Sequence, residues 1–572
     1  MSHKQVTASD GVRLSVRVSG DPDGPTVVLV HGYPDNSSMW DGVAEQLRER
    51  HRVVVYDVRG AGESDKPRSR RAYRLDQLED DLAAVVDAVR PNGKVHLLAH
   101  DWGSIQAWQA VTGDRLRGRI ASYTSLSGPS LDHAGAWFRA QLTRPTPRRL
   151  GHALRQFLHS YYIVAFQLPV LPELMWRTGI MRTLIRKLEP AEAAPKTSDG
   201  VHGLKLYRAN MGPRLSRPRP RPADIPVQVL APTGDSYVTG PLQTEVERWV
   251  PDLYVRRVIG SHWITRAKPA VVATAAAELI AAVETGEETR SLRRARVGRT
   301  GRFAHHLVVI TGAGSGIGRE TALAFAAEGA DVVVSDINGD SAAETAKLVR
   351  ERGVDAGEYT VDSSDAEAVA KFAEGVREEF GVPDIVVNNA GIGMSGPFLD
   401  TTIEDWEKVI DVNLWGVIHG CRAFAPMMKE RSEGGQIVNL ASAAAYLPSK
   451  ILTAYGTTKA AVLALSNGLR AELAADGIGV TAICPGLVNT NITSTTRFVG
   501  VSSEEEQRRQ KASSKLYARR NFGPERVARD ILTAVEKNVA VQPSTPEAKA
   551  AWILSRLTPG VLRAAAKLDV TP

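Results

Sequence analysis

Short runs of apolar, β-branched residues alternate with longer stretches of helical periodicity through most of the chain. Runs at 26–30 (TVVLV), 52–58 (RVVVYDV) and 95–100 (VHLLAH) are followed much later by similar runs at 307–311 (LVVIT) and 384–390 (DIVVNNA). Continuous apolar strands bounded by glycine or aspartate are typical of parallel sheets that helices cover on both faces. The pattern therefore predicts an α/β fold class, and its repetition predicts two α/β domains.

The chain of 572 residues exceeds the ~250 to 300 residues at which a single hydrophobic core stops growing. The stretch around 286–305 is polar and arginine-rich, without helical or strand periodicity, so we interpret it as a linker between domains at 1–285 and 306–540. Residues 541–572 form a C-terminal extension in this interpretation. Residues 130–222 interrupt the first domain with a helical, aromatic-rich insertion, which we expect to form a cap over the ligand-binding ends of the strands.

The formal charge of +7 is small for this length, although arginines cluster near 139–155, 213–221 and 290–302. Such clusters usually mark solvated faces or linkers, and the alternative is attraction to an anionic lipid surface or an acidic substrate. No nucleic-acid reader motif or interleaved aromatic pattern accompanies them, so we expect no nucleic-acid partner.

The two cysteines, Cys421 and Cys484, provide neither a disulfide framework nor a CxxC metal pair, and we expect no metal site. Residues 1–11 lack the apolar core of a signal peptide, and no run of about 18 apolar residues could span a bilayer. We therefore expect a soluble cytoplasmic protein that is at most peripheral to membranes.

The segment AHDWG at 99–103 follows an apolar run and precedes a helical pattern, as a nucleophile elbow does. Small residues, here Ala99 and Gly103, must flank the nucleophile because the backbone is crowded at such a turn. Taken alone, the segment is equally consistent with Asp101 capping the next helix.

Three further features follow in the chain order nucleophile, acid, histidine that is expected of an α/β-hydrolase. The backbone amide of Tyr33 in HGYP could join that of Trp102 in an oxyanion hole. Asp235 and His262 each come just after a predicted strand. We therefore predict a catalytic triad of Asp101, His262 and Asp235 in an α/β-hydrolase fold with a helical cap.

These residues resemble those of epoxide hydrolases of the α/β-hydrolase fold, whose close relatives are the haloalkane dehalogenases. Both families use an aspartate nucleophile. A carboxylate is already ionised at neutral pH and attacks an sp3 carbon, displacing oxygen or halide. His262, oriented by Asp235, would then activate a water to hydrolyse the ester on Asp101.

The leaving group distinguishes the two families, because an epoxide oxygen needs a proton donor and a halide does not. The resemblance implies two cap tyrosines for this role: Tyr162 in YYIVAFQLP, with Tyr161 as its nearby competitor, and Tyr207 in LYRANM. For a single cap tyrosine, packing in the core is the alternative. The sequence departs from the family at Ala99 and Ser261, where glycines are usual, which affects pocket shape more than reaction type.

LVVITGAGSGIGRETALAF (307–325) reads as a strand, a glycine-rich turn and a helix, the pattern that binds a pyrophosphate at a helix N-terminus. Asp336 lies about 20 residues further on, where an acid binds the ribose hydroxyls and repels a 2′-phosphate. Its neighbour is Ile337 and no basic residue, so the sequence favours NAD over NADP as the cofactor.

Residues 306–540 resemble a short-chain dehydrogenase/reductase, with TGAGSGIG, VDSSD, NNAG, VNLWG, NLAS, YGTTK and ICPGLVNT in the family's order. The resemblance implies a Rossmann-type doubly wound parallel sheet. It places Asp362 at the adenine, Asn389 at the adenosine side and Thr490 at the nicotinamide. The implied cofactor-binding residues are Gly312, Ser315, Gly316, Ile317, Gly318, Asp336, Asp362, Asn389, Tyr455, Lys459 and Thr490.

The resemblance places Ser442, Tyr455, Lys459 and Asn413 at the catalytic positions. Tyr455 and Lys459 are i and i+4 on one helix face, so we expect the ammonium to lower the pKa of the phenol and to bind the nicotinamide ribose. Ser442 would hold the substrate oxygen, and Asn413 would support a water relay to Lys459.

An epoxide hydrolase makes a vicinal diol, which a dehydrogenase can oxidise. We therefore expect a bifunctional enzyme that acts on related lipophilic compounds; fusions of this kind resemble proteins of mycolate-making bacteria, which suggests long-chain lipid epoxides. The alternatives are a dehalogenase or a non-catalytic lipid-binding module fused to an active dehydrogenase. The resemblance also implies a homodimer or homotetramer through the helix that carries Tyr455, and it leaves peripheral membrane contact through the basic cap edge or the C-terminal tail open.

Overall fold

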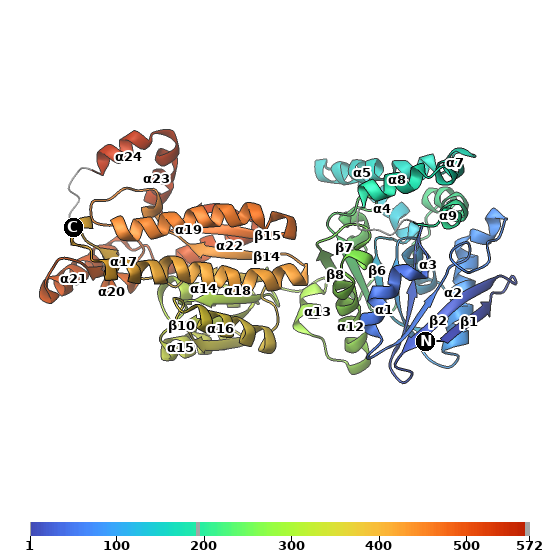
Figure 1. The fold of residues 1–572 in the computed structure, drawn as a ribbon, viewed down its shortest axis with the longest axis horizontal. Coiled ribbons are helices and arrows are strands. Elements are labelled where there is room, and N and C mark those ends of the chain that lie inside the picture. Colours follow the sequence, from blue (N-terminus) through green and yellow to red (C-terminus); the bar gives the residue numbers. More distant parts are fainter. Residues whose placement is uncertain (1, 190–194, 567–572) are drawn as a thin grey trace. The chain divides into compact units, whose positions relative to one another are not determined.

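The computed structural model describes residues 2–189 and 195–566, and the chain divides into two compact units between Gly298 and Arg299 (Figure 1). Residues 190–194 of the predicted cap and 567–572 of the predicted C-terminal extension lie outside the described residues. The predicted α/β fold class is confirmed in both units.

The first unit is built on an eight-stranded sheet in which only the two pairings made by β2 are antiparallel. In spatial order its strands are β1 (Ser2–Thr7), β2 (Arg13–Gly20), β4 (Arg52–Tyr56), β3 (Thr26–Val30), β5 (Val95–His100), β6 (Ile120–Leu126), β7 (Val227–Pro232) and β8 (Leu253–Val258). Both faces are apolar because successive side chains of a strand point to opposite sides. Val28 and Val30 pack in the core with α2 (Leu75–Val89) and α3 (Trp102–Thr112), whereas Val27 and Leu29 pack with α1 (Asp41–Leu47) and α12 (Pro269–Thr285).

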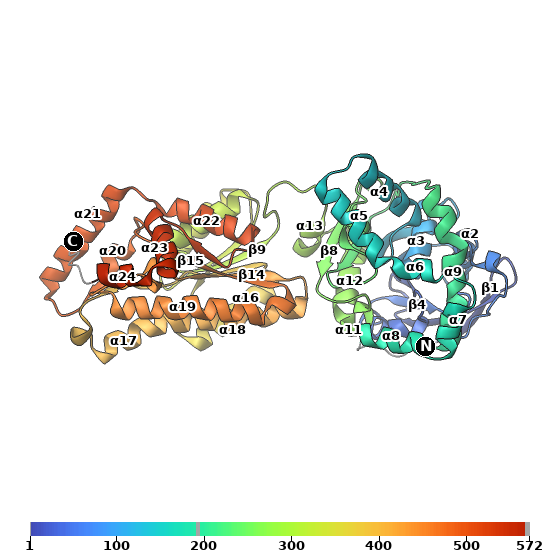
Figure 2. The same cartoon turned by 90° about the horizontal axis from the view of Figure 1, so that it is seen from above.

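Between β6 and β7 the chain leaves the sheet and forms a helical cap, which Figure 2 shows from above. Its helices are α4 (Leu131–Thr143), α5 (Pro147–His159), α6 (Tyr161–Ala165), α7 (Leu171–Arg177), α8 (Ile180–Leu188) and α9 (Thr197–Ser216). The cap contributes aromatic side chains to a buried cluster that also contains Tyr33 and Trp102 from the sheet side. This cluster places the cap helices directly over the ends of β3 and β5.

The second unit has a seven-stranded sheet in which every pairing is parallel. Its strands in spatial order are β11 (Ala356–Thr360), β10 (Asp331–Asp336), β9 (Leu307–Thr311), β12 (Ile385–Asn388), β14 (Gly435–Leu440), β15 (Ile478–Cys484) and β17 (Val541–Pro543). One core contains α14 (Gly316–Ala327), α15 (Gly339–Arg350) and α22 (Pro524–Glu536), and the other contains α16 (Ala366–Glu379), α18 (Gly416–Arg431) and α19 (Thr453–Glu472). Helices therefore cover both faces, as a doubly wound sheet requires.

Two boundaries differ from the prediction. The segment predicted as an irregular linker contains a helix, α13 (Arg290–Ala295), because Leu292 and Ala295 lie three residues apart and pack on Tyr254 and Leu279. Three arginines and a serine occupy the other positions of this short helix and mask that spacing in the sequence. The second sheet also extends past residue 540, since β17 pairs with β15 through Val541 and Ala482.

Candidate active sites

Asp101 lies in a sharp turn between β5 and α3, with φ +50° and ψ −122°. Few non-glycine residues adopt such a conformation, and it persists only where the surroundings enforce it. A side chain at residue 103 would meet the carbonyl oxygen of Val30 at 2.2 Å, and one at residue 32 would meet the carboxylate of Asp101 at 2.5 Å. Gly103 and Gly32 therefore let two neighbouring strand ends approach the strained residue closely.

His262 connects the two aspartates of the predicted triad. Its Nδ1 lies 3.1 Å from both carboxylate oxygens of Asp235, and its Nε2 lies 3.8 Å from Oδ2 of Asp101. Asp235 also accepts hydrogen bonds from the backbone N–H groups of Tyr237 and Val238 at 2.8 and 3.0 Å. All three members of the triad are buried and lie together at the carboxyl ends of the strands.

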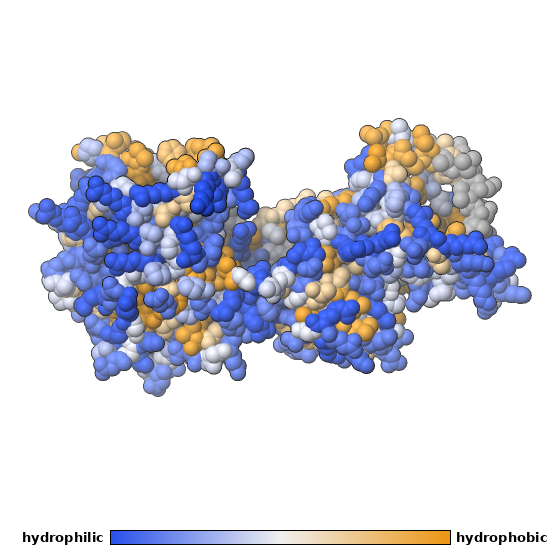
Figure 3. All heavy atoms as spheres, turned by 180° about the vertical axis from the view of Figure 1, so that it is seen from behind, coloured by the Kyte–Doolittle hydropathy of each residue, from blue (hydrophilic) through white to orange (hydrophobic). Residues whose placement is uncertain are grey.

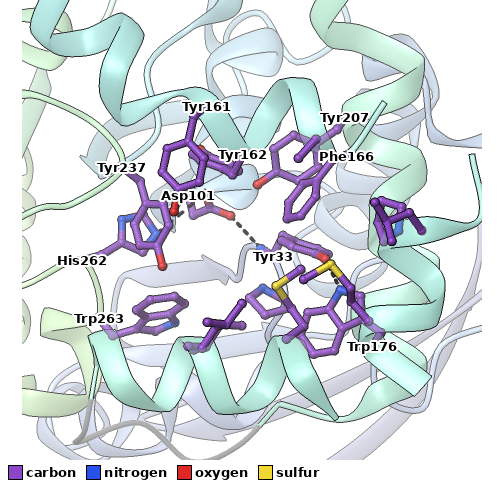
Figure 4. Close-up of a pocket in the computed structure, with 18 residues that line it drawn as sticks. Tyr33, Asp101, Tyr161, Tyr162, Phe166, Trp176, Tyr207, Tyr237, His262 and Trp263 are labelled. Carbon is purple, nitrogen blue, oxygen red and sulfur yellow. Dashed lines mark hydrogen bonds and ion pairs between the residues drawn. The ribbon is translucent and has the colours of Figure 1, made fainter. Parts of the chain in front are cut away.

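The two backbone amides predicted for an oxyanion hole both point at the carboxylate of Asp101. The N–H of Tyr33 donates to Oδ1 at 2.7 Å, and the N–H of Trp102 also hydrogen bonds this carboxylate. Figure 4 shows the contact between Tyr33 and Asp101. In an ester of Asp101, the same donors would face an oxygen of the carbonyl group under attack.

Burial and charge set the protonation of the triad. Burial raises the pKa of Asp101 to about 6, against the lowering effect of His262 and the two amides. Burial alone would lower the pKa of His262, but the carboxylates of Asp235 and Asp101 outweigh it and raise that pKa to about 9. Burial likewise opposes ionisation of Asp235, yet the charge and hydrogen bond of His262 lower its pKa.

Two cap tyrosines face Asp101 from the opposite side of the cavity. Tyr162 on α6 and Tyr207 on α9 have ring centroids 6.0 Å apart, and the ring of Tyr207 lies 4.9 Å from that of Trp102. Burial raises the pKa of both phenols well above the usual value, so both are protonated and able to donate. Tyr161 and Tyr162 both line the cavity that Asp101 borders, but Tyr161 is 69% exposed whereas Tyr162 is half-buried (Figure 4).

The cavity between cap and sheet has a volume of about 170 Å³ and is almost entirely apolar and aromatic apart from Asp101, His262 and tyrosine hydroxyls. A second cavity of about 60 Å³ lies beside it and shares Asp101, Tyr162, Tyr207 and Tyr237 as lining residues. Asp101 therefore borders two cavities.

Two aromatic residues of this site were not predicted from the sequence. Trp176 on α7 donates its indole N–H to the hydroxyl of Tyr33 at 2.7 Å, and the ring of Tyr237 lies 4.8 Å from that of His262. Side chains at residues 200 and 203 would meet the rings of Trp176 and Tyr33 at 2.3 Å. The pair Gly200 and Gly203, one helical turn apart in DGVHG, is the sequence signal for this close packing.

In the second unit, the glycine-rich turn follows β9 and opens α14. Gly312 and Gly316 have φ of +62° and +57°, and a side chain at residue 318 would meet the carbonyl oxygen of Gly312 at 2.3 Å. The side-chain amide of Asn389 donates to that carbonyl at 2.8 Å. Ser315, Ile317 and Gly318 stand at the N-terminus of α14, so the turn has the open backbone that a pyrophosphate requires.

Asp336 ends β10, and its carboxylate accepts hydrogen bonds from the N–H groups of Gly314 at 2.8 Å and of Asn338 at 3.0 Å. Thr490 lies against the turn, 3.3 Å from where a Cβ of residue 316 would stand. Asp362 accepts from the N–H of Ser364 at 2.9 Å. These residues suit a nicotinamide dinucleotide, because a carboxylate and open backbone border the turn.

The predicted catalytic residues of the second unit come from three segments. Tyr455 and Lys459 lie on α19, Ser442 follows the end of β14, and Asn413 lies in a π-helical turn at Asp411–Trp415. The amine of Lys459 donates to the carbonyl of Leu440 at 2.8 Å, and Asn413 exchanges two hydrogen bonds with the backbone of Ile392. A Cβ at residue 391 would lie 3.0 Å from Oδ1 of Asn413 and 3.4 Å from Nζ of Lys459, so these two groups flank the same glycine.

The expected lowering of the Tyr455 pKa by Lys459 does not occur in this structure. Burial raises the pKa of Tyr455 to about 12, partly offset by a hydrogen bond from Ser442, and Tyr517 on α21 (Ser503–Arg520) raises it further. Nζ of Lys459 lies 5.9 Å from the centre of the phenol ring, and burial lowers the pKa of this lysine to about 8. Desolvation therefore dominates the pKa of this phenol.

Elsewhere in the described residues, no group of three or more histidine, cysteine or acidic side chains could hold a metal ion. Cys421 and Cys484 are both buried and unpaired with each other. A search of the described helices finds none with the length and apolarity needed to cross a bilayer.

Comparison with known proteins identifies both units. The family model described as alpha/beta hydrolase fold matches residues 25–146, and that described as short chain dehydrogenase matches residues 306–498. Among solved structures, a short chain dehydrogenase/reductase from Burkholderia phymatum in complex with NAD is 30% identical, with a TM-score of 0.41, over 47% of this chain and 99% of that chain.

Curated relatives match the whole chain. The Probable oxidoreductase EphD of Mycobacterium tuberculosis and that of Mycobacterium bovis are each 44% identical to it over 583 aligned positions, covering 99% of this chain and 98% of theirs. This similarity runs through both units and the segment between them. The chain therefore belongs to the family of proteins represented by EphD, in which an α/β-hydrolase unit is fused to a short-chain dehydrogenase/reductase unit.

Proposed function

We propose that the first unit hydrolyses lipophilic epoxides to vicinal diols and that the second oxidises or reduces a hydroxyl or ketone on a related compound with NAD. The observation that carries the first activity is the arrangement around Asp101. Its carboxylate lies 2.7 Å from the amide of Tyr33 and 3.8 Å from His262, and the cap tyrosines Tyr162 and Tyr207 line the same cavity.

In the first step, the carboxylate of Asp101 attacks a ring carbon and the carbon–oxygen bond of the epoxide breaks. The electron pair moves to the ring oxygen, which takes a proton from Tyr162 or Tyr207. Their high pKa keeps them protonated until an alkoxide forms. The products are an ester on Asp101 and a tyrosinate.

In the second step, His262 takes a proton from a water that attacks the ester carbonyl, and the amides of Tyr33 and Trp102 stabilise the oxyanion. The carboxylate of Asp101 is one of the charges that raise the pKa of His262. Because esterification removes that charge, it lowers the pKa of His262 and favours the neutral imidazole, the form that can accept a proton from water. Collapse of the oxyanion releases the diol, and the proton on His262 restores the tyrosine.

The two buried phenols of the cap favour an epoxide over a haloalkane. A departing halide needs only N–H donors; the indole N–H of Trp176 is bonded to the hydroxyl of Tyr33, whereas that of Trp102, beside Asp101, is buried without an acceptor among the described residues. The two buried phenols supply the proton that an alkoxide requires. We therefore rank haloalkane dehalogenation second, and loss of turnover with retention of lipid binding third.

In the second unit, a bound nicotinamide dinucleotide would supply the hydride acceptor or donor. The glycine turn and α14 would hold its pyrophosphate, and Asp336 would bind the adenosine ribose and repel a 2′-phosphate. Ser442 would hold the substrate oxygen while Tyr455 moves its proton. Lys459, with its pKa of about 8, would bind the other ribose and, with Asn413, carry the proton toward solvent.

Oxygen-18 labelling tests the first activity. In a single turnover with enzyme in excess over a fatty epoxide in oxygen-18 water, the new hydroxyl of the diol should carry light oxygen and Asp101 should gain heavy oxygen. Heavy oxygen that enters the diol directly would contradict an aspartyl ester. Halide release from a chloroalkane, without turnover of any epoxide, would support the dehalogenase.

Addition of NAD to the same reaction tests the second activity. NADH should form only after the diol appears, and supplying the diol directly should remove the delay. NADP should be used at least about tenfold less efficiently, because the carboxylate of Asp336 repels its extra phosphate.

A further inference from the structure

Large hydrophobic side chains gather on the outer surface of the cap, where Figure 3 shows a hydrophobic area at the upper left. On α5, Leu150, Leu154, Phe157 and Leu158 are 46, 60, 66 and 61% exposed. Their spacing of i, i+4, i+7 and i+8 puts them on one face, while Gln156 on the other face is buried. This helix therefore turns an apolar stripe outward.

The apolar surface continues through the next three helices of the cap. We define the cap face by six large hydrophobic residues between α5 and the start of α7, each 60–72% exposed: Leu154, Phe157, Leu158, Tyr161, Val164 and Val170. Single exposed hydrophobic residues are ordinary on a protein surface, but a contiguous group of this size marks a binding surface.

The charge around the cap face is strongly positive. Between residues 144 and 187 the chain carries eight arginines and lysines, all exposed, and a single acid, Glu173. Glu173 is bonded to Arg208. None of the eight cations forms an ion pair with a carboxylate of the described residues. A partner for this surface must therefore combine apolar groups with negative charge.

The cap face also leads into the hydrolase cavity. Tyr161, Leu171 and Leu184 are 69, 49 and 45% exposed, and all three line the cavity that reaches Asp101. A compound leaving an apolar phase in contact with the cap face would therefore meet apolar side chains all the way to the nucleophile.

We propose that the cap face binds the surface of an anionic lipid membrane, with the hydrophobic residues inserted among the lipids and the surrounding arginines at the headgroups. An anionic bilayer matches the apolar centre and the cationic surroundings together, and amphipathic helices of this kind lie in the plane of the interface. Binding does not depend on the reaction proposed above. Direct transfer of substrate from the bilayer into the cavity does rest on it.

Sedimentation of the full chain with vesicles tests the binding. The protein should pellet with vesicles of phosphatidylglycerol and phosphatidylcholine at about tenfold lower lipid concentration than with phosphatidylcholine alone, and salt should reduce the difference. Phe157→Ser with Leu158→Ser, and separately Arg148→Glu with Arg149→Glu, should each weaken binding by about tenfold or more.

A matched control lies on the C-terminal helices α23 (Pro546–Leu557) and α24 (Pro559–Ala565). Leu557 and Val561 are 75 and 55% exposed there, so Leu557→Ser with Val561→Ser removes apolar surface of a similar kind from the second unit. This variant should bind vesicles like the unmodified protein. All variants should hydrolyse a water-soluble epoxide normally, whereas the cap variants should hydrolyse an epoxide embedded in vesicles more slowly.

The proposal is overturned if the unmodified protein stays in solution with anionic vesicles, or if the cap variants pellet as well as it does. It is also overturned if only the control variant loses binding, which would assign the contact to the C-terminal helices. A concentration-dependent increase in molecular mass that Phe157→Ser with Leu158→Ser abolishes, without vesicle binding, would assign the cap face to a second copy of the chain. Vesicle binding without hydrolysis of any epoxide would leave the membrane contact in place and refute only the reaction.

Discussion

In the first unit one side chain connects the two predicted acids: His262 hydrogen bonds Asp235 and lies 3.8 Å from Asp101, whose carboxylate also accepts from the amide of Tyr33. In the second unit Ser442 hydrogen bonds Tyr455, but Lys459 bonds to the carbonyl of Leu440 and Asn413 to the backbone of Ile392. The triad of the first unit is therefore in contact through His262, whereas Lys459 and Asn413 of the second unit are each held by the backbone. A substitution in one unit should leave the activity of the other unit unchanged. The effects of two substitutions should depart most from additivity when both lie in the first unit.

Removal of the nucleophile should give the largest effect. Asp101→Ala should lower the rate of epoxide hydrolysis by about 10⁴-fold or more, because without the nucleophile the other catalytic residues have no ester to hydrolyse. Oxidation of the diol, supplied directly, should be unchanged. The reciprocal variant Tyr455→Phe should abolish oxidation and spare hydrolysis. If either variant lowered both activities, the two sites would not be chemically independent.

Removal of the base should separate the two steps of hydrolysis. His262→Gln should lower turnover by about 10² to 10⁴-fold, and the protein should accumulate an ester on Asp101 that intact-mass measurement detects. The attack itself uses the carboxylate and the tyrosines, so it should proceed. The absence of any added mass after exposure to an epoxide would contradict the covalent route.

The cap tyrosines should show a graded effect. Tyr162→Phe and Tyr207→Phe should each lower kcat for epoxide opening by about tenfold, and the double variant by about 10²-fold or more, because either phenol can supply the proton. Tyr161→Phe is the matched control, since the side chain of Tyr161 lines the same cavity but is 69% exposed. An equal loss in the control would show that the effect comes from packing at the mouth of the cavity.

The two sites should also differ in pH dependence. Asp101 must be ionised to attack, and its pKa of about 6 means that kcat/KM for hydrolysis should fall about tenfold for each pH unit below 6. Tyr455 must instead lose its proton for oxidation, and burial raises its pKa to about 12. Oxidation should therefore rise with pH over the range in which hydrolysis has reached its plateau. Parallel profiles would contradict this assignment of protons.

The sequence predicts most of this arrangement because reactive residues of α/β folds stand where strands end. Asp101, Asp235 and His262 each follow an apolar run, and the i and i+4 spacing of Tyr455 and Lys459 is visible without a structure. Long-range packing is not visible in this way. Trp176 bonds to Tyr33 across 143 positions of sequence, and the pKa of Tyr455 depends on desolvation, which no local pattern reports. The helix α13 was missed because arginines surround its two buried residues.

The smallest effect concerns the hydrogen bond between Trp176 of the cap and Tyr33 in the loop after β3, which the sequence did not predict. Trp176→Phe removes the donor to the hydroxyl of Tyr33, and that buried hydroxyl would lose its partner at a cost of about 1 to 3 kcal/mol in the free energy of unfolding of the first unit. Tyr33→Phe removes the other partner, so the double variant should cost less than the sum of the two single variants. Because the backbone of Tyr33 holds Asp101, each single variant should also slow hydrolysis a few-fold, while oxidation stays unchanged. Additive costs would mean that the bond contributes nothing, and that the ring contacts of Tyr33 with Trp176, Tyr207 and Phe166 alone position the loop.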